Sequence, residues 1–360
     1  MLKYILVFII FIHGLIHILG FAKAFNYGNI NQISREISKT AGILWLLVAL
    51  LFITTAIFYL SKKDAWLVFG IIAVIISQIV IFTVWNDAKF GTIANIIVLI
   101  ALILNYGSYN FEKGYQKDVN ENLKRTNALK TDLLTEADLQ PLPEPVQRFL
   151  KYTDVLNKPK LKNIRIVFEG QMREKGKDFF PFTCEQYNFF DEPTRLFFMK
   201  AKMKGIIVPG YHRYSDANAL MDIRLFGFFT VVKKEGKDMD QAETVTLFND
   251  MCMMAPATLI DKRITWQAID NNSAKAIFTN QGITISAILY FNEKGQLIDF
   301  ISNDRDINNI PFSTPVSNYK NINGINIMTY GEAIWHYPDG KFVYGKFNLK
   351  EVEYNVSTLK

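Results

Sequence analysis

Two histidines lie four residues apart in FIHGLIHILGF (11–21), one of the most apolar stretches of the chain. In a helix this spacing places His13 and His17 on one face, about 6 Å apart. Ionisable side chains are costly inside a membrane helix, so they usually face neighbouring helices and often mark a function. The pair is therefore the first candidate for chemistry in this sequence.

Three roles fit the two histidines. They could share a metal ion, contact a quinone or a haem, or hydrogen-bond as neutral imidazoles to neighbouring helices, for example through Gln78 or Asn95. One haem cannot take both as axial ligands, because axial ligands approach the iron from opposite sides. The first 106 residues hold no other His or Cys, so a metal ion would need help from other polar side chains: Gln78, Asn86, Asp87 and Asn95. The hydrogen-bonding role is favoured, and His13 and His17 remain candidate metal ligands.

A second set of candidates lies in the later part of the chain. Glu185 belongs to CEQY (184–187), Asp250 to a predicted helix, and Arg305 follows LIDFIS (297–302). If these three converge, they could hold the head group of a ligand, because arginine binds carboxylates and phosphates in bidentate fashion. The alternative is ordinary surface ion pairing, worth about 0–1 kcal/mol per pair.

Met251 and Met254 stand close to Phe248 in the same predicted helix. Methionine side chains are flexible and polarizable, so they can line an adaptable apolar pocket, although they more often fill a core. We include both as candidate ligand-binding residues.

No catalytic signature is present in the sequence: G-x-S-x-G, H-E-x-x-H, the P-loop and G-x-G-x-x-G are all absent. His212 and His336 lie in strand-like contexts and are interpreted as packed or exposed strand residues. Cys184 and Cys252 match no metal or redox spacing, so we expect two buried thiols, or one disulfide in an oxidising compartment. We expect no cofactor, and the protein is more easily explained as a binding protein than as an enzyme.

The 360 residues are 50% hydrophobic, and the excess lies in the first 106. Four apolar segments, at about 4–25, 41–60, 65–85 and 90–106, approach the ~20 residues that a bilayer-crossing helix needs. The first lacks a small-residue cleavage site, so we expect it to be retained. These features predict a multi-pass protein of the cell membrane. The net charge of +6 without a basic, aromatic-rich block disfavours nucleic acid as a partner.

Four crossings would leave both flanking regions on the same side of the membrane. Seven basic residues would share that side and four would lie opposite, which predicts a cytoplasmic C-terminal domain. The seven are Lys3, Lys62, Lys63, Lys113, Lys117, Lys124 and Arg125, and the four are Lys23, Arg35, Lys39 and Lys89.

Residues 107–158 read as a polar connector with a short amphipathic helix, because Val146, Phe149, Leu150 and Thr153 recur at helical spacing. From about residue 159 to 360, apolar residues instead recur at every second position, and turn-forming residues separate these alternating stretches. This pattern predicts roughly eight to eleven antiparallel strands. Apolar residues return to helical spacing at about 240–260, where Pro256 should bend or end the helix. The sequence thus predicts a multi-domain protein of class α plus α+β. A four-helix transmembrane bundle would precede an antiparallel sheet covered by one or two helices.

The stretches LPEPVQRFLKYT (142–153), CEQY, LFNDMCMMAPATLIDKRITW (247–266) and EAIW (332–335) resemble a bacterial family of membrane-associated proteins of unassigned function. HGLIHILGFAKAF (13–25) and WNDAKFGTIANII (85–97) look like the membrane elements of its four-helix members. The strand meander with a helical cover is also similar to bacterial lipoprotein-carrier domains. That similarity implies a curved half-barrel around an apolar cavity that takes acyl chains.

These observations predict a membrane-anchored binding module whose partners are the bilayer and a lipid or other amphipathic ligand. Two alternatives remain. One is a membrane oxidoreductase or metal-dependent enzyme centred on His13 and His17. The other is a scaffold that binds another protein, for which the later domain should have a solid core without a cavity.

Overall fold

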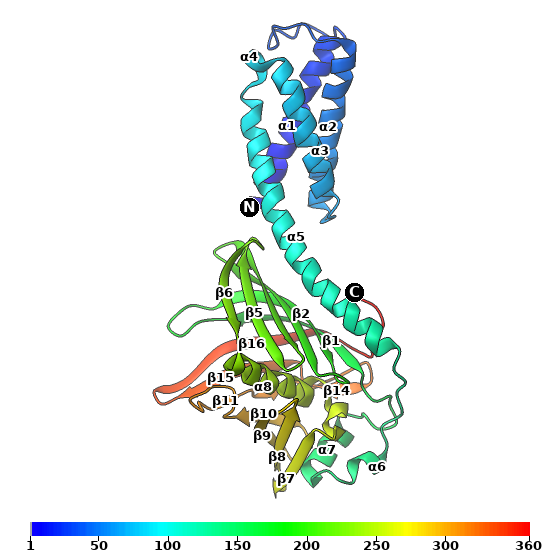
Figure 1. Cartoon of the computed structure of the whole chain (residues 1–360), viewed down its shortest axis with the longest axis vertical. Helices are drawn as coiled ribbons and strands as arrows, with labels where there is room; N and C mark the ends of the chain where they lie inside the picture. Colours follow the sequence, from blue (N-terminus) through cyan, green and yellow to red (C-terminus); the bar gives the residue numbers. More distant parts are fainter. Residues whose placement is uncertain (1) are drawn as a thin grey trace. The chain divides into compact units, whose positions relative to one another are not determined.

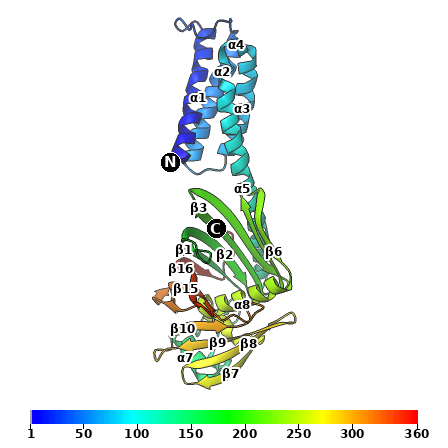
Figure 2. The same ribbon diagram turned by 90° about the vertical axis from the view of Figure 1, so that its left-hand side faces the viewer.

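The computed structural model describes residues 2–360, and the chain divides into two compact units between Asn110 and Phe111. The first unit consists of helices. The second unit, called the β-domain below, holds the sheet and its covering helices (Figures 1 and 2).

Four helices in the described residues are long and apolar enough to cross a membrane. They are α1 (Leu2–Ala24), α2 (Lys39–Leu60), α3 (Trp66–Thr83) and α5 (Gly91–Asn127), with the single turn α4 (Trp85–Ala88) before α5. Helix α5 passes the predicted end of the fourth apolar segment at 106 and continues through residues expected to form the connector. The polar residues after 106 retain good helix formers such as Glu, Lys and Gln, so the helix does not stop where the apolar run stops.

Glycines allow α1 and α2 to approach closely. A Cβ atom at Gly20 would lie 2.2 Å from the Trp45 ring, and one at Gly42 would lie 2.3 Å from the Ala24 Cβ. Small residues at such crossings let membrane helices pack backbone against backbone. The helix pair therefore depends on the absence of side chains at these two positions.

The β-domain contains one large antiparallel sheet of fourteen strands, in the order β6-β5-β4-β3-β2-β1-β16-β15-β11-β10-β9-β8-β7, with β12 paired to β15. Its first half comprises β1 (Asn163–Met172), β2 (Phe180–Phe189), β3 (Thr194–Met203), β4 (Ile206–Ser215), β5 (Asn218–Leu225) and β6 (Phe229–Glu235). The second half comprises β7 (Ile264–Asp270), β8 (Ser273–Asn280), β9 (Ile283–Phe291), β10 (Leu297–Ser302), β11 (Phe312–Ser313), β12 (Val316–Ser317), β15 (Tyr330–Tyr337) and β16 (Gly340–Tyr354).

The short strands β13 (Lys320–Ile322) and β14 (Ile325–Ile327) form a separate hairpin. The strand number exceeds the predicted eight to eleven, and four of the strands have only two or three residues, too few to show an alternating pattern. The sheet is curved (Figure 2). It is open, because its two edge strands, β6 and β7, do not pair with each other within residues 2–360.

Helix α8 (Lys237–Met254) lies inside the curve of the sheet (Figure 1). Its Phe248 stacks on Phe278 at 5.2 Å between ring centroids and also contacts Phe300. The helix ends before Pro256, and the turn η1 (Pro256–Ile260) follows. Two more helices, α6 (Glu136–Leu139) and α7 (Glu144–Tyr152), precede the sheet, and Phe149 of α7 packs on Phe291.

The last turns of α5 cover the opposite face of the first strands. Tyr115 of α5 stacks on Phe198 of β3, and Phe111, Val119 and Leu123 join the same cluster. The second half of β2, residues 184–189, is therefore largely buried on both sides. Alternate side chains of β2 point to α5 or into the curve of the sheet, and this alternation decides which polar residues reach the site described next.

Candidate ligand-binding pocket

A cavity of about 520 Å³ lies between α8 and the concave side of the sheet. Its size falls in the range of small-molecule sites, which are mostly apolar clefts with a few placed polar groups. The apolar lining is made largely by phenylalanine and methionine: Phe168, Phe180, Phe197, Phe312, Phe347, Met172, Met199, Met203, Met221, Met253 and Met328. Unbranched methionines can adjust to the shape of a flexible guest.

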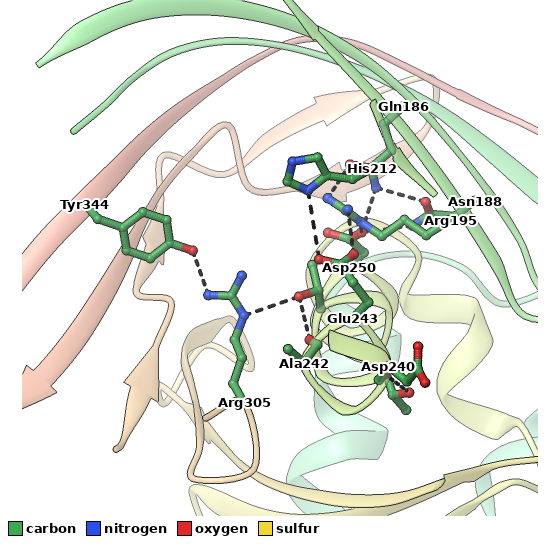
Figure 3. A network of polar contacts seen from close by, with 12 residues as sticks. Gln186, Asn188, Arg195, His212, Asp240, Ala242, Glu243, Asp250, Arg305 and Tyr344 are labelled. Atoms are coloured by element: carbon green, nitrogen blue, oxygen red, sulfur yellow. Dashed lines mark hydrogen bonds and ion pairs between the residues drawn. The ribbon is translucent and has the colours of Figure 1, made fainter. Parts of the chain in front are cut away.

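A buried ion network lies where α8 meets the sheet (Figure 3). Arg195 of β3 donates to Asp250 at 2.8 Å and to Glu243 at 3.1 Å, both on α8. Gln186 and Asn188 of β2 donate to the same carboxylate oxygen of Asp250 at 2.6 and 3.1 Å. Burial alone would lower the pKa of Arg195, but the two carboxylates outweigh it and the pKa is raised. The side chains of the network are hydrogen-bonded to one another, and they join α8 to the sheet.

A second arginine also lines the cavity, but its partners are not carboxylates. Arg305 donates to the Tyr344 hydroxyl at 2.7 Å and to Thr246 at 3.3 Å (Figure 3). Its guanidinium lies 4.1 Å from the ring centroid of Phe312 and 5.4 Å from that of Trp335. None of the ion pairs within residues 2–360 includes Arg305. A cation held by aromatic rings and hydroxyl groups keeps its charge available to an anion.

His212 of β4 lines the cavity beside these groups. Its Nδ1 lies 4.0 Å from Glu243, whereas its Nε2 is buried and has no hydrogen-bond partner within the described chain. Burial lowers the pKa of His212 to about 4, with Arg195 and Arg305 acting in the same direction against Glu243. The ring is therefore neutral at pH 7, and one of its nitrogens is free to bond a ligand.

Residues 132–347, which include every residue that lines the cavity, match a family model described as "Family of unknown function (DUF6544)". The chain belongs to this family. Among solved structures, this DUF6544 protein is similar to a LolA superfamily protein from Nitrosomonas europaea. The sequence identity is 9%, the match covers 58% of this chain and 92% of that chain, and the TM-score is 0.36. The comparison with curated proteins found no match.

The structure brings two of the five proposed ligand-binding residues of this DUF6544 protein to the cavity, Asp250 and Arg305. Glu185 points to the opposite face of the sheet, where it pairs with Arg165 at 2.7 Å. It is the neighbour of Gln186, and adjacent residues of a strand face opposite sides.

Met251 and Met254 are fully buried in the core, while Met253 reaches the cavity. The cavity-facing side of α8 carries Glu243, Thr246, Asp250 and Met253, spaced by three and four residues. Residues 251 and 254 lie on another face of the helix.

Sequence reasoning missed Arg195, Glu243 and His212. A signal existed for Arg195, because it is a charged residue in the otherwise apolar strand TRLFFM (194–199). A charge inside a buried strand requires a partner of opposite charge.

The histidine pair in the helical unit is held in a hydrogen-bond network. His17 bonds through Nδ1 to the His13 carbonyl at 2.8 Å and through Nε2 to Ser77 at 2.9 Å. His13 Nε2 bonds to Asn95 Oδ1 at 2.9 Å, and Asn95 donates to Gln78 at 3.0 Å. Among the described residues, no group of three or more His, Cys, Asp or Glu side chains could hold a metal ion. The interactions link α1 to α3 and α5.

Proposed function

We propose that this protein is a membrane-anchored module that binds a lipid or similar amphipathic molecule with an anionic head group. The four apolar helices would hold it in the cell membrane, and the cavity of the β-domain would hold the ligand. One observation carries the proposal: Arg305, without a carboxylate partner in the described residues, faces a cavity whose walls are otherwise mainly apolar.

The charges around the cavity support an anionic ligand. Arg195 is neutralised by Asp250 and Glu243, whereas Arg305 has no carboxylate partner in the described residues. Arg173, which also lines the cavity and donates to the Val343 carbonyl, is a second cation without such a partner there. A carboxylate or phosphate could bond Arg305 while the apolar chain lies along the phenylalanine and methionine walls. The neutral ring of His212 could add one hydrogen bond.

Binding explains these groups better than catalysis does. Asp250 and Glu243 are committed to Arg195, so neither carboxylate is a free general base. The cavity also speaks against the scaffold alternative, which predicts a solid core. The excess of basic residues on one flank favours a cytoplasmic β-domain, a prediction that reporter fusions at either end of the chain would check.

Native mass spectrometry of the full chain in mild detergent tests the proposal, with oleic acid and lysophosphatidylglycerol as probes. Losing a hydrogen bond to a charged group costs about 1.5–3 kcal/mol, so Arg305→Leu should weaken binding roughly 10- to 100-fold. Arg213→Leu is the matched control, because Arg213 lies on the same sheet, outside the cavity, and pairs with Asp118. Equal binding by the two variants, or no binding by the unmodified protein, would reject the proposal.

A further inference from the structure

Two neighbouring hairpins carry most of the exposed apolar side chains of the first half of the sheet. The β3–β4 hairpin exposes Met203, Ile206 and Ile207, and the β5–β6 hairpin exposes Phe228 and Phe229, with Val231 following in β6. Strands β4 and β5 are antiparallel neighbours, so β4 begins where β5 ends and the two hairpin tips lie at one end of the sheet (Figure 1). We call residues 203–207 and 226–231 the hairpin rim.

The turns of both hairpins hold these side chains outward. Lys204 and Gly205 both have positive φ angles, 50° and 84°, as a two-residue hairpin turn requires. Phe226 also has a positive φ, 55°, which bulky side chains rarely adopt. Six exposed apolar side chains at adjacent tips exceed the scattered single exposures that are normal on a soluble surface.

The cavity opens at the rim. Met203 and Val231 both line the cavity, yet they are 41% and 56% exposed. A side chain that borders the interior space and the solvent marks an opening. A ligand entering here would pass between apolar side chains.

Basic residues predominate around the rim. Lys202, Lys204, Lys233 and Lys234 are exposed, and residues 203–207 and 226–231 contain no acidic residue. Lys233 also pairs with the exposed Glu235 at 3.2 Å. Apolar side chains flanked by lysines suit the interface of an anionic bilayer, where apolar groups enter the boundary of the acyl chains and lysines meet the head groups. The same chain carries four helices apolar enough to cross a membrane, so a bilayer is the surface to which this domain is tethered.

We infer that the hairpin rim docks on the surface of an anionic bilayer and that lipid passes through it into the cavity. This inference rests on the proposed function, because it supplies the route to the ligand site. Docking itself requires only the rim and the lysines, so it can be tested separately from ligand binding.

The test places a fluorescent label on a cysteine at the rim of the full chain, in vesicles of phosphatidylcholine with about one third phosphatidylglycerol. Phe229→Cys is the rim variant, and Ile269→Cys, on β7 and 51% exposed, is the matched control. Cys184 and Cys252 are buried and free, so they should stay unlabelled in the folded chain. Ile207→Cys provides a second rim position if Phe229→Cys does not fold.

Lipids with a nitroxide at a shallow acyl position should quench the rim label at least threefold more than the control label. Replacing the four lysines by glutamine should reduce the quenching toward the value in pure phosphatidylcholine. Equal quenching at rim and control would overturn the inference. Cross-linking of two copies through residue 229 without lipid quenching would also overturn it and identify a self-association surface.

The proposed lipid binding and the proposed docking of the rim can be rejected independently of each other. Quenching at the rim in a protein that binds no lipid by mass spectrometry would leave docking and remove the proposed function. A protein that carries lipid but whose rim label is not quenched would leave the proposed function and remove docking.

Discussion

Replacing Arg195 by methionine should lower the free energy of unfolding of the β-domain by about 3–5 kcal/mol, because the change leaves two buried carboxylates without their cation. The side chains of Glu243 and Asp250 are only 5% and 10% exposed, so water cannot replace the guanidinium. Gln186 and Asn188 would still donate to Asp250, which favours the lower end of this range. Such a loss is a large part of the 5–15 kcal/mol that ordinarily separates folded from unfolded domains.

Thiol labelling in urea measures this loss in the full chain. Both cysteines lie in the β-domain and are buried, and burial raises the pKa of Cys184 to about 12, so rapid labelling reports unfolding of that domain alone. With a urea dependence of about 3 kcal/mol per molar for a domain of this size, the midpoint should fall by roughly 1–1.7 M.

Arg213→Met is the control, because its half-exposed pair with Asp118 at 3.5 Å should contribute about 0–1 kcal/mol. Arg195→Lys should fall between the two variants, since an ammonium keeps the charge but cannot donate in the planar geometry of arginine. If Arg195→Met unfolds at the same urea concentration as Arg213→Met, the buried network contributes no more than a surface pair and our reasoning is wrong.

Three further predictions concern other residues. His212 binds protons less readily in the folded domain, where its pKa is about 4, than in the unfolded chain, where it is about 6.5, so the domain should lose about 3 kcal/mol as the pH falls through this window. Burial raises the pKa of Asp299 to about 6, so this residue should instead make the folded domain more stable as the pH falls. To isolate the contribution of the histidine, urea midpoints are measured across pH 4–7 for the unmodified protein and for His212→Gln. The difference between the two proteins is the contribution of His212. Gly20→Leu should disrupt the packing of α1 on α2 and lower the yield of folded protein in detergent, whereas Leu at an exposed helix position such as Ile43 should be tolerated. The metal content of the purified chain should be the same in a His13→Ala/His17→Ala variant, because the imidazoles already bond to their neighbours, and loss of a bound ion in that variant would restore the metal hypothesis.

The coarse fold could be predicted because its signals are local. Apolar runs near 20 residues long indicated the four long apolar helices, and the period of two indicated strands such as β9. The open half-barrel form came from the resemblance to carrier domains. The pairing of β1 with β16 had no local signal, since register between distant strands depends on the packing of the whole sheet.

The site was harder to predict because it depends on which way each side chain points. Asp250 and Arg305 were found from charge alone, whereas Glu185 differs from Gln186 by one position and faces the other side of the sheet. His212 carries no pattern in sequence that separates it from an exposed histidine. Its importance appears only when its unpartnered nitrogen is seen beside Glu243 and Arg305.

The adjacent positions of β1 and β16 also bear on how the domain is made. Ile164 pairs with Tyr354 and Met172 with Gly345, so the middle of the sheet joins segments separated by more than 170 residues. Contacts of such long sequence separation are slow to form. During synthesis β1 to β6 must wait for β16, and the edge of β1 stays open to pairing with another chain until it arrives. A ribosome stalled before residue 340 would therefore leave an aggregation-prone half-sheet rather than a smaller folded domain.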